Sequence, residues 1–168
     1  MPLERFSAAW REQYVTSTGV GTSSTETGEC VFCVLAQAPV SEESGILWRS
    51  ATNYVTLNAF PYGSGHLLVL PVRHVARLEE LSDEQYRDFF FTLRRVVSAV
   101  NAAYNPDGMN VGMNLGQAAG AGIPQHLHGH VLPRWNGDTN FMTTIGETRV
   151  LPESLQSTWQ KVHARLES

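Results

Sequence analysis

The clearest hydrophobic pattern in the chain is an apolar stripe at helical spacing between residues 82 and 105. Ser82 and Gln85, three positions apart, form the sequence pattern of a capping box at the start of a helix. The segment "NPDG" at 105–108 contains residues that end helices. The pattern predicts a long helix with one face in the core. That face consists of Tyr86, Phe89, Phe90, Leu93, Val96, Val97 and Val100.

Shorter apolar runs with strand character lie on both sides of this helix. "GILWRSATNYVTLNAF" (45–60) alternates, "HLLVLPV" (66–72) is expected to end at Pro71, and "MNVGMNLG" (109–116) is interrupted by glycines. A second helical pattern follows near "PESLQSTWQKVHARL" (152–166). Strands on either side of one strong helix predict an α+β fold with an antiparallel sheet.

The chain of 168 residues is long enough for one domain with a sizeable core. A content of 42% hydrophobic and 17% charged residues is typical of a globular protein. Residues 4–14 show helical spacing and are followed by a polar stretch rich in glycine, serine and threonine. We therefore expect an N-terminal helical arm and flexible linker over 1–25 and the main domain over 26–168.

Charge and segment composition limit the classes of partner. A net charge of −4 argues against general binding to nucleic acid or to an anionic membrane surface. The first residues resemble no signal peptide, and no run approaches the roughly 20 apolar residues that cross a bilayer. These features predict a cytoplasmic protein with no nucleic-acid or membrane partner. In the cytoplasm its thiols are expected to stay reduced.

The candidate chemistry lies in "QHLHGHVLPRW" (125–135), where His126, His128 and His130 alternate. Alternate residues share one face of a strand, whereas on a helix they point in nearly opposite directions. His126 and His130 would lie about 13 Å apart along a strand, so one metal ion could not bind all three rings. The three imidazoles are therefore expected to have different roles.

Two kinds of chemistry fit such a row. A metallohydrolase would use imidazoles to hold a metal that activates water, but residues 126–134 lack the additional carboxylate or histidine that such sites use. Alternatively, a neutral imidazole attacks phosphorus directly. The loop "GQAAGAG" (116–122) favours this second interpretation, because glycines let backbone N–H groups approach phosphate oxygens. Gly129 is expected to leave the opposite strand face bare, and Arg134 is either a phosphate donor or a surface residue.

The two cysteines, Cys30 and Cys33, form the sequence "CVFC". In a reducing compartment such a pair is half of a metal site, a redox motif, or two unengaged thiols. A redox pair is expected at the start of a helix that follows a strand, whereas here a polar linker, "TSTGVGTSSTETGE", precedes it. Metal binding is therefore the favoured interpretation.

"QHLHGHVLP" resembles the His-x-His-x-His motif, followed by apolar residues, of the histidine-triad (HIT) superfamily of nucleotide hydrolases and transferases. Residues 57–82 are similar to the family's ribose-contacting strand. Residues 110–141 are similar to the bacterial branch that includes diadenosine tetraphosphate phosphorylase. The resemblance extends over about 26–152. It implies a HIT-like α+β fold with an antiparallel half-barrel sheet, one long helix and a C-terminal helix, paired across a homodimer with a nucleotide over each sheet.

The resemblance also implies roles for individual residues. His128 corresponds to the nucleophile that forms a nucleotidyl-histidine, His130 to the ring that contacts the scissile phosphate, and His66 to a supporting histidine. Asn58 corresponds to the residue that binds the ribose hydroxyls, and Asn114 to an amide near the phosphates. The remaining substrate-binding candidates are Gly116, Gln117, Gly120, Gly122 and Trp135.

Zinc-binding relatives, including the galactose-phosphate uridylyltransferases, use a Cys-x-x-Cys pair, a later histidine and the first histidine of the triad. Cys30, Cys33, His74 and His126 match these positions, which implies a structural Zn²⁺ site. His128 and His130 would then remain for phosphate. Whether Mg²⁺ or Mn²⁺ binds with the substrate as a second cofactor stays open. His163, on the C-terminal helix, is expected to be solvated.

The expected activity is phosphorolysis of a diadenosine polyphosphate at its α-phosphate. The chain lacks the Gly-Gln-Ser/Thr element of the animal hydrolases, so phosphate contacts are expected from backbone N–H groups or from Gln117. The galactose-phosphate uridylyltransferases have glutamine at the third triad position, whereas this chain has His130. A sugar-phosphate acceptor is therefore disfavoured. Dinucleoside polyphosphate hydrolysis, purine nucleoside phosphoramidase activity and nucleotide sensing without turnover stay open as alternatives.

Overall fold

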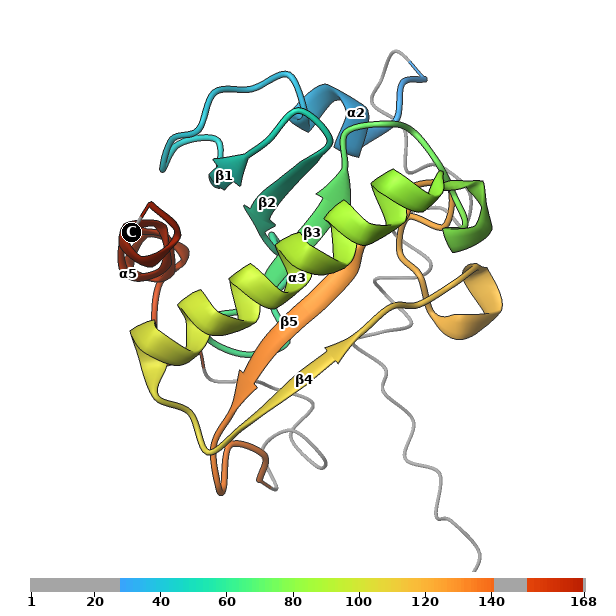
Figure 1. The fold of residues 1–168 in the computed structure, drawn as a ribbon. Helices are drawn as coiled ribbons and strands as arrows, with labels where there is room; N and C mark the ends of the chain where they lie inside the picture. Colours follow the sequence, from blue (N-terminus) through green and yellow to red (C-terminus); the bar gives the residue numbers. More distant parts are fainter. Residues whose placement is uncertain (1–27, 141–150, 168) are drawn as a thin grey trace, which may run out of the picture.

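The computed structural model describes residues 28–140 and 151–167. The helical arm predicted within residues 1–25 lies outside these ranges. The described chain forms one five-stranded antiparallel sheet in the order β1-β2-β3-β5-β4 (Figure 1). The strands are β1 (Ile46–Arg49), β2 (Asn53–Leu57), β3 (Leu67–Pro71), β4 (Gly108–Gly112) and β5 (Gly129–Arg134).

Helices cover one face of the sheet and one of its edges. The long helix α3 crosses a face diagonally, and the C-terminal helix α5 lies beside the edge strand β1 (Figure 1). The helices are α2 (Val31–Leu35), α3 (Asp83–Tyr104) and α5 (Leu155–Leu166), with short 3₁₀ turns η1 (Leu78–Glu80) and η2 (Gln117–Ala119). Within the described ranges, no helix has the length and apolar character that crossing a membrane requires.

The predicted long helix and its capping box are confirmed in α3. The Ser82 hydroxyl accepts from the Gln85 N–H at 3.2 Å, and the Gln85 side chain accepts from the Ser82 N–H at 3.1 Å. The helix ends at Asn105, whose φ of 44° is a left-handed conformation that asparagine tolerates better than most residues. Local sequence signals therefore define both ends of this helix.

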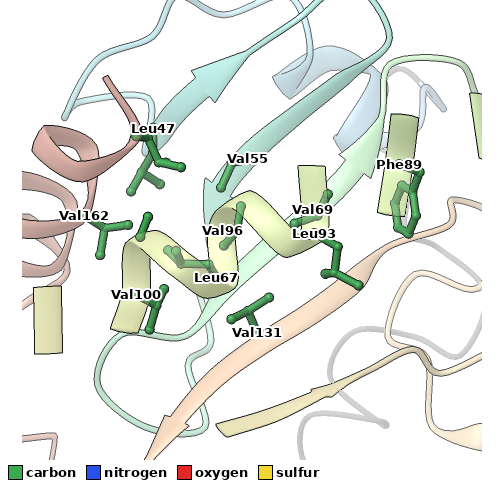
Figure 2. Packing of buried hydrophobic residues seen from close by; sticks show 12 residues of the cluster. Leu47, Val55, Leu67, Val69, Phe89, Leu93, Val96, Val100, Val131 and Val162 are labelled. Atoms are coloured by element: carbon green, nitrogen blue, oxygen red, sulfur yellow. The ribbon is translucent and has the colours of Figure 1, made fainter. Parts of the chain in front are cut away.

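The main core lies between α3, α5 and one face of the sheet. Phe89, Leu93, Val96 and Val100 of α3 face the strands, as predicted (Figure 2). Tyr86, at the start of the predicted stripe, is instead 45% exposed. The stripe meets Leu47, Val55, Leu67, Val69 and Val131 from the sheet and Val162 from α5.

The segment 45–60, whose alternation predicted strand character, forms two strands, β1 and β2, joined by a tight turn. The hydroxyl of Ser50 accepts from the backbone N–H groups of Thr52 and Asn53, at 3.2 and 3.0 Å. The carboxylate of Asp88, on α3, accepts hydrogen bonds from the side chains of Thr52 and Asn53. A serine turn held by a distant helix therefore interrupts the strand pattern.

The histidine segment also differs from the predicted continuous strand, because β5 begins only at Gly129. The chain turns at His126, whose N–H bonds to Ile123, and the Leu127 N–H bonds to the Val75 carbonyl at 2.6 Å. The strand face at Gly129 was expected to be bare, but Phe89 of α3 covers it. A Cβ there would lie 3.3 Å from Cζ of Phe89, so the glycine allows α3 to pack closely against β5.

The expectation that His163 is solvated is wrong. Its ring is half-buried, its Nδ1–H donates to the Leu47 carbonyl at 2.7 Å, and it stacks on Trp159 with ring centroids 4.2 Å apart. The indole N–H of Trp159 donates to the Ile46 carbonyl at 2.9 Å. Helix α5 thus satisfies carbonyl groups at the sheet edge that would otherwise need another partner.

Two phenylalanines on α3 test this packing, because Phe89 is fully buried whereas Phe91 is 56% exposed. Phe89→Ala should lower the free energy of unfolding by about 3–5 kcal/mol, since it removes a core ring and leaves a cavity. Phe91→Ala removes the same atoms from the surface and should cost less than about 1 kcal/mol. Urea denaturation followed by circular dichroism measures both, and similar losses for the two variants would contradict the described core.

Candidate active site and metal centre

The three alternating histidines lie side by side on the sheet face opposite α3. His126 and His128 precede β5, and His130 lies on it. The rings of His128 and His130 have centroids 5.1 Å apart, and Phe32 of α2 contacts both His126 and His128. His126 is 1% exposed and His128 is 6% exposed, so their ring nitrogens must find partners within the protein.

Hydrogen bonding fixes which nitrogen of His128 carries the proton. Its Nδ1 lies 2.8 Å from the carbonyl oxygen of His126, and a carbonyl can only accept. The proton therefore lies on Nδ1, and Nε2 keeps a free lone pair. Burial lowers the pKa of His128, although the bond to the His126 carbonyl opposes this shift. His128 is thus a neutral imidazole with a nucleophilic Nε2.

A second chain of hydrogen bonds fixes the proton of His130. The backbone N–H of Tyr62 donates to Nδ1 of His66 at 3.0 Å, so the neutral His66 carries its proton on Nε2. That nitrogen lies 2.9 Å from Nδ1 of His130, which therefore accepts and leaves the His130 proton on Nε2. Nε2 of His130 is buried and has no hydrogen-bond partner among the described residues. Burial, and then the repulsion that would arise if His128 and His130 were both protonated, lower the pKa of His130 to about 4.

A cavity of about 700 Å³ opens beside His130. Four predicted site residues line it, namely His66, His130, Asn114 and Trp135. The described residues that line the cavity do not include His128, Asn58, Gln117 or the loop glycines. The cavity thus begins at the third histidine of the row and extends away from the second.

Asn58 lies next to His66, and its amide is engaged within the protein. Its Oδ1 accepts from the N–H of Phe60 at 3.0 Å, and its Nδ2 lies 3.2 Å from Nδ1 of His66. These bonds hold the turn that leads to His66. The contact of Asn58 with ribose stays a prediction.

The glycine loop adopts backbone conformations that favour glycine. Gly116 and Gly120 have φ values of 81° and 88° and flank the turn η2, and Gly122 follows. Gln117 lies in the turn and is exposed. Phosphate binding by the loop stays a prediction.

Arg134 does not present its guanidinium to the histidines. Its Nη1 donates to Asn110 at 2.6 Å and its Nη2 donates to Asp138 at 2.7 Å, while Nε also binds Asp138. The same contact holds the pKa of Asp138 well below its usual range. Arg134 is therefore paired with a carboxylate.

The predicted metal ligands come together from three separate segments. The donor atoms of Cys30, Cys33, His74 and His126 lie within 4.8 Å of one another. Nδ1 of His126 lies 3.5 and 3.6 Å from the two sulfurs, close to the roughly 3.6 Å between sulfur and nitrogen ligands of a tetrahedral zinc ion. Nε2 of His126 donates to the Pro71 carbonyl at 2.9 Å, so its Nδ1 lone pair faces the thiols. These four residues could hold a metal ion.

The electrostatics of the cluster also fit a cation. Burial, and then the hydrogen bond and charge of Cys30, raise the pKa of Cys33 to about 11. Burial lowers the pKa of His126 to about 4. Cys33 therefore stays a thiol and His126 stays neutral when no ion is bound, and a bound metal ion would stabilise the thiolate form of Cys33.

Sequence reasoning missed Tyr62. Its backbone N–H orients His66, and its ring lies 4.7 Å from the His66 ring and nearly parallel to that of His130. The segment "PYGSG" indicates only a turn when it is read for its proline and glycines. An aromatic residue in a turn shortly before a histidine was the available signal.

Comparison with known proteins agrees with this arrangement. A family model described as the HIT domain matches residues 41–137, so the chain belongs to the HIT family. A protein of Mycobacterium tuberculosis named AP-4-A phosphorylase is 41% identical over 120 residues, which cover 71% of this chain and 62% of that relative. The match thus spans less than two thirds of the relative's length.

Two further relatives extend the comparison. The bis(5'-nucleosyl)-tetraphosphatase (asymmetrical) of Schizosaccharomyces pombe is 32% identical over 95 residues, covering 56% of this chain and 52% of that protein. The crystal structure of a zinc-bound histidine triad family protein from Mycobacterium smegmatis superposes with a TM-score of 0.66. It is 26% identical, and the match covers 82% of this chain and 93% of that one.

Proposed function

We propose that the chain cleaves dinucleoside polyphosphates at the α-phosphate through a nucleotidyl intermediate on His128. The observation that carries this proposal is the hydrogen bond from Nδ1 of His128 to the His126 carbonyl, which leaves Nε2 free to attack. The name of the M. tuberculosis relative, AP-4-A phosphorylase, supports the substrate class.

In the first step, Nε2 of His128 attacks the α-phosphorus. A phosphorus–nitrogen bond forms, the bridging phosphorus–oxygen bond breaks, and the remaining nucleoside polyphosphate leaves. The Nε2–H of His130 donates a hydrogen bond to phosphate oxygens as charge develops on them, and His66 holds that proton in place. In the second step an acceptor attacks the phosphorus and releases neutral His128.

The acceptor decides the product. Orthophosphate yields a nucleoside diphosphate, whereas water yields a nucleoside monophosphate. The similarity of residues 110–141 to the phosphorylase branch and the name of the M. tuberculosis relative favour orthophosphate. Hydrolysis is the second candidate, favoured by the name of the S. pombe relative.

We also propose that Cys30, Cys33, His74 and His126 hold a structural Zn²⁺. A closed shell of four protein ligands stabilises the fold and leaves no position for substrate. If His126 binds this ion, it cannot also protonate the leaving group. The zinc-bound state of the relative from M. smegmatis supports the choice of metal.

The remaining proposals concern assembly and setting. We propose that residues 26–168 form the HIT domain and that this domain pairs as a homodimer. The protein acts on its nucleotide substrate in the cytoplasm. Mg²⁺ or Mn²⁺ binds with the phosphates of the substrate. The family resemblance supports the dimer. The unpaired cysteines support a reducing compartment.

A product assay tests the proposed activity. The protein is mixed with diadenosine tetraphosphate, with and without orthophosphate, and the products are separated by anion-exchange chromatography. We expect ADP and ATP only when orthophosphate is present, because orthophosphate is the proposed acceptor. His128→Ala should reduce this turnover by at least about 10³-fold, since it removes the nucleophile.

His163→Gln is the control, because His163 is also hydrogen-bonded but lies on α5, outside the row. It should keep its activity. AMP and ATP formed without orthophosphate would identify a hydrolase instead. Two ADP from hydrolysis, or turnover that survives in His128→Ala, would contradict attack by His128 at the α-phosphate. No turnover by the unmodified protein would favour a nucleotide sensor.

The metal centre is tested by zinc content and thermal stability. Protein purified without chelator should contain about one zinc ion per chain by elemental analysis. His74→Ala removes an exposed ligand and should lose most of the zinc and about 5–10 °C of melting temperature. Arg73→Ala, at the exposed neighbouring position, should keep both. Zinc-free wild-type protein, or equal effects of the two variants, would refute the site.

A further inference from the structure

The turn that leads to His66 contains a serine hydroxyl that forms no hydrogen bond within the described residues. Oγ of Ser64 is buried, although the residue as a whole is only half-buried. Ser64 lines the cavity of about 700 Å³ beside His130. A buried hydroxyl without a partner is unfavourable, because it has lost its hydrogen bonds to water. A ligand oxygen in the cavity would restore one of them.

Polar atoms without a partner concentrate at this cavity. In the described ranges, three buried side-chain nitrogen or oxygen atoms lack a hydrogen-bond partner, namely Nε of Arg49, Oγ of Ser64 and Nε2 of His130. Ser64 and His130 line the cavity, whereas Arg49 does not. Both atoms at the cavity can donate, since the proton of His130 lies on Nε2. Two donors without acceptors indicate a ligand rich in hydrogen-bond acceptors, such as phosphate.

The backbone next to Ser64 packs against β5. A Cβ at Gly63 would lie 3.4 Å from Cδ1 of Leu132, which also lines the cavity. Leu132 lies two residues beyond His130 on β5, so the two side chains share one face of the strand. The turn therefore places Ser64 one step beyond His130, on the side away from His128.

The order of these residues matches the order of groups in the proposed reaction. Nε2 of His128 attacks the α-phosphorus, and the leaving oxygen departs roughly in line on the opposite side. In a dinucleoside polyphosphate this oxygen belongs to the β-phosphate. The acceptor then displaces His128 from the side that the β-phosphate has vacated. The β-phosphate and orthophosphate therefore use the same place, beyond His130 as seen from His128.

Uncharged donors must recognise a phosphate at this place. Arg134 also lines the cavity, but the carboxylate of Asp138 neutralises its guanidinium. Hydrogen bonds to charged groups are stronger than those between neutral groups, so a hydroxyl that donates to a phosphate oxygen contributes substantially. The Ser64 hydroxyl and the Nε2–H of His130 are two such donors.

We propose that the hydroxyl of Ser64 binds the phosphate next to the α-phosphorus, which is the β-phosphate of the substrate in the first step and orthophosphate in the second. The inference rests on the proposed function, because it names the residue that receives the acceptor of that reaction. In the second step, an unprotonated oxygen of hydrogen phosphate attacks the α-phosphorus. The phosphorus–nitrogen bond breaks, and its electron pair returns to Nε2 of His128. The proton of hydrogen phosphate stays on the terminal phosphate of the nucleoside diphosphate. Ser64 thus favours orthophosphate over water as the acceptor.

Equilibrium binding tests the proposal without turnover. In the His128→Ala background, calorimetry compares ADP, which has a β-phosphate, with AMP, which has none. ADP should bind at least about 10-fold more tightly, and Ser64→Ala should reduce this preference about 10-fold, the effect expected for one hydrogen bond to a charged group. The affinity for AMP should change by less than about twofold, because AMP does not reach Ser64.

Two further variants separate the hydroxyl from the fold. Ser64→Thr keeps a hydroxyl and should keep most of the preference for ADP. Ser98→Ala removes an exposed hydroxyl of α3, which donates to the Arg94 carbonyl at 3.1 Å, and should change neither affinity. An unchanged preference in Ser64→Ala would overturn the proposal, and so would equal losses of affinity for AMP and ADP.

The orthophosphate dependence of turnover tests the role in the second step. With diadenosine tetraphosphate at saturation, Ser64→Ala should raise the orthophosphate concentration that gives half-maximal ADP formation at least about 10-fold. Ser98→Ala should leave this concentration unchanged. An unchanged value in Ser64→Ala would contradict binding of the acceptor by Ser64. If the preference for ADP depends on Ser64 but unmodified protein turns over no dinucleotide, the phosphate site stands and the proposed activity fails.

Discussion

The hydrogen bond from Nδ1–H of His128 to the carbonyl oxygen of His126 is the contact on which the proposed chemistry depends. It fixes the tautomer of a buried imidazole and leaves Nε2 as a nucleophile at neutral pH. The acceptor is itself constrained, because the His126 ring donates to the Pro71 carbonyl and directs its other nitrogen to Cys30 and Cys33. One residue thus connects the metal-ligand cluster to the proposed nucleophile.

The fold supports this contact because the two faces of the sheet have different roles. Helix α3 covers one face of the sheet, and the histidines lie on the other, next to the small cluster around Phe32. Gly129 lies between His128 and His130 but points to the helix side, where Phe89 packs against it. The alternation of the strand therefore places catalytic candidates and core packing at adjacent positions. A larger residue at Gly129 would disturb both.

Local patterns in the sequence predicted the elements whose signals are local. The capping box at Ser82 and the end of β3 at Pro71 are confirmed. The family resemblance, rather than a local pattern, predicted that Cys30 and Cys33 group with His126, and the structure brings their donor atoms together. The start of β5, the pairing of Arg134 with Asp138 and the burial of His163 were not predicted. The first and last of these depend on contacts between distant segments, such as Leu127 with Val75 and His163 with Leu47. The Arg134 contact is close in sequence, but no helical or strand periodicity reveals it.

The tautomer of His128 is the most direct test of the account. A long-range proton–nitrogen correlation spectrum of ¹⁵N-histidine-labelled protein at neutral pH distinguishes protonated from unprotonated ring nitrogens, with His128→Ala used for assignment. We predict that His128 carries its proton on Nδ1 and has an unprotonated Nε2, while His130 shows the reverse. A proton on Nε2 of His128, or a doubly protonated ring, would contradict the proposed nucleophile.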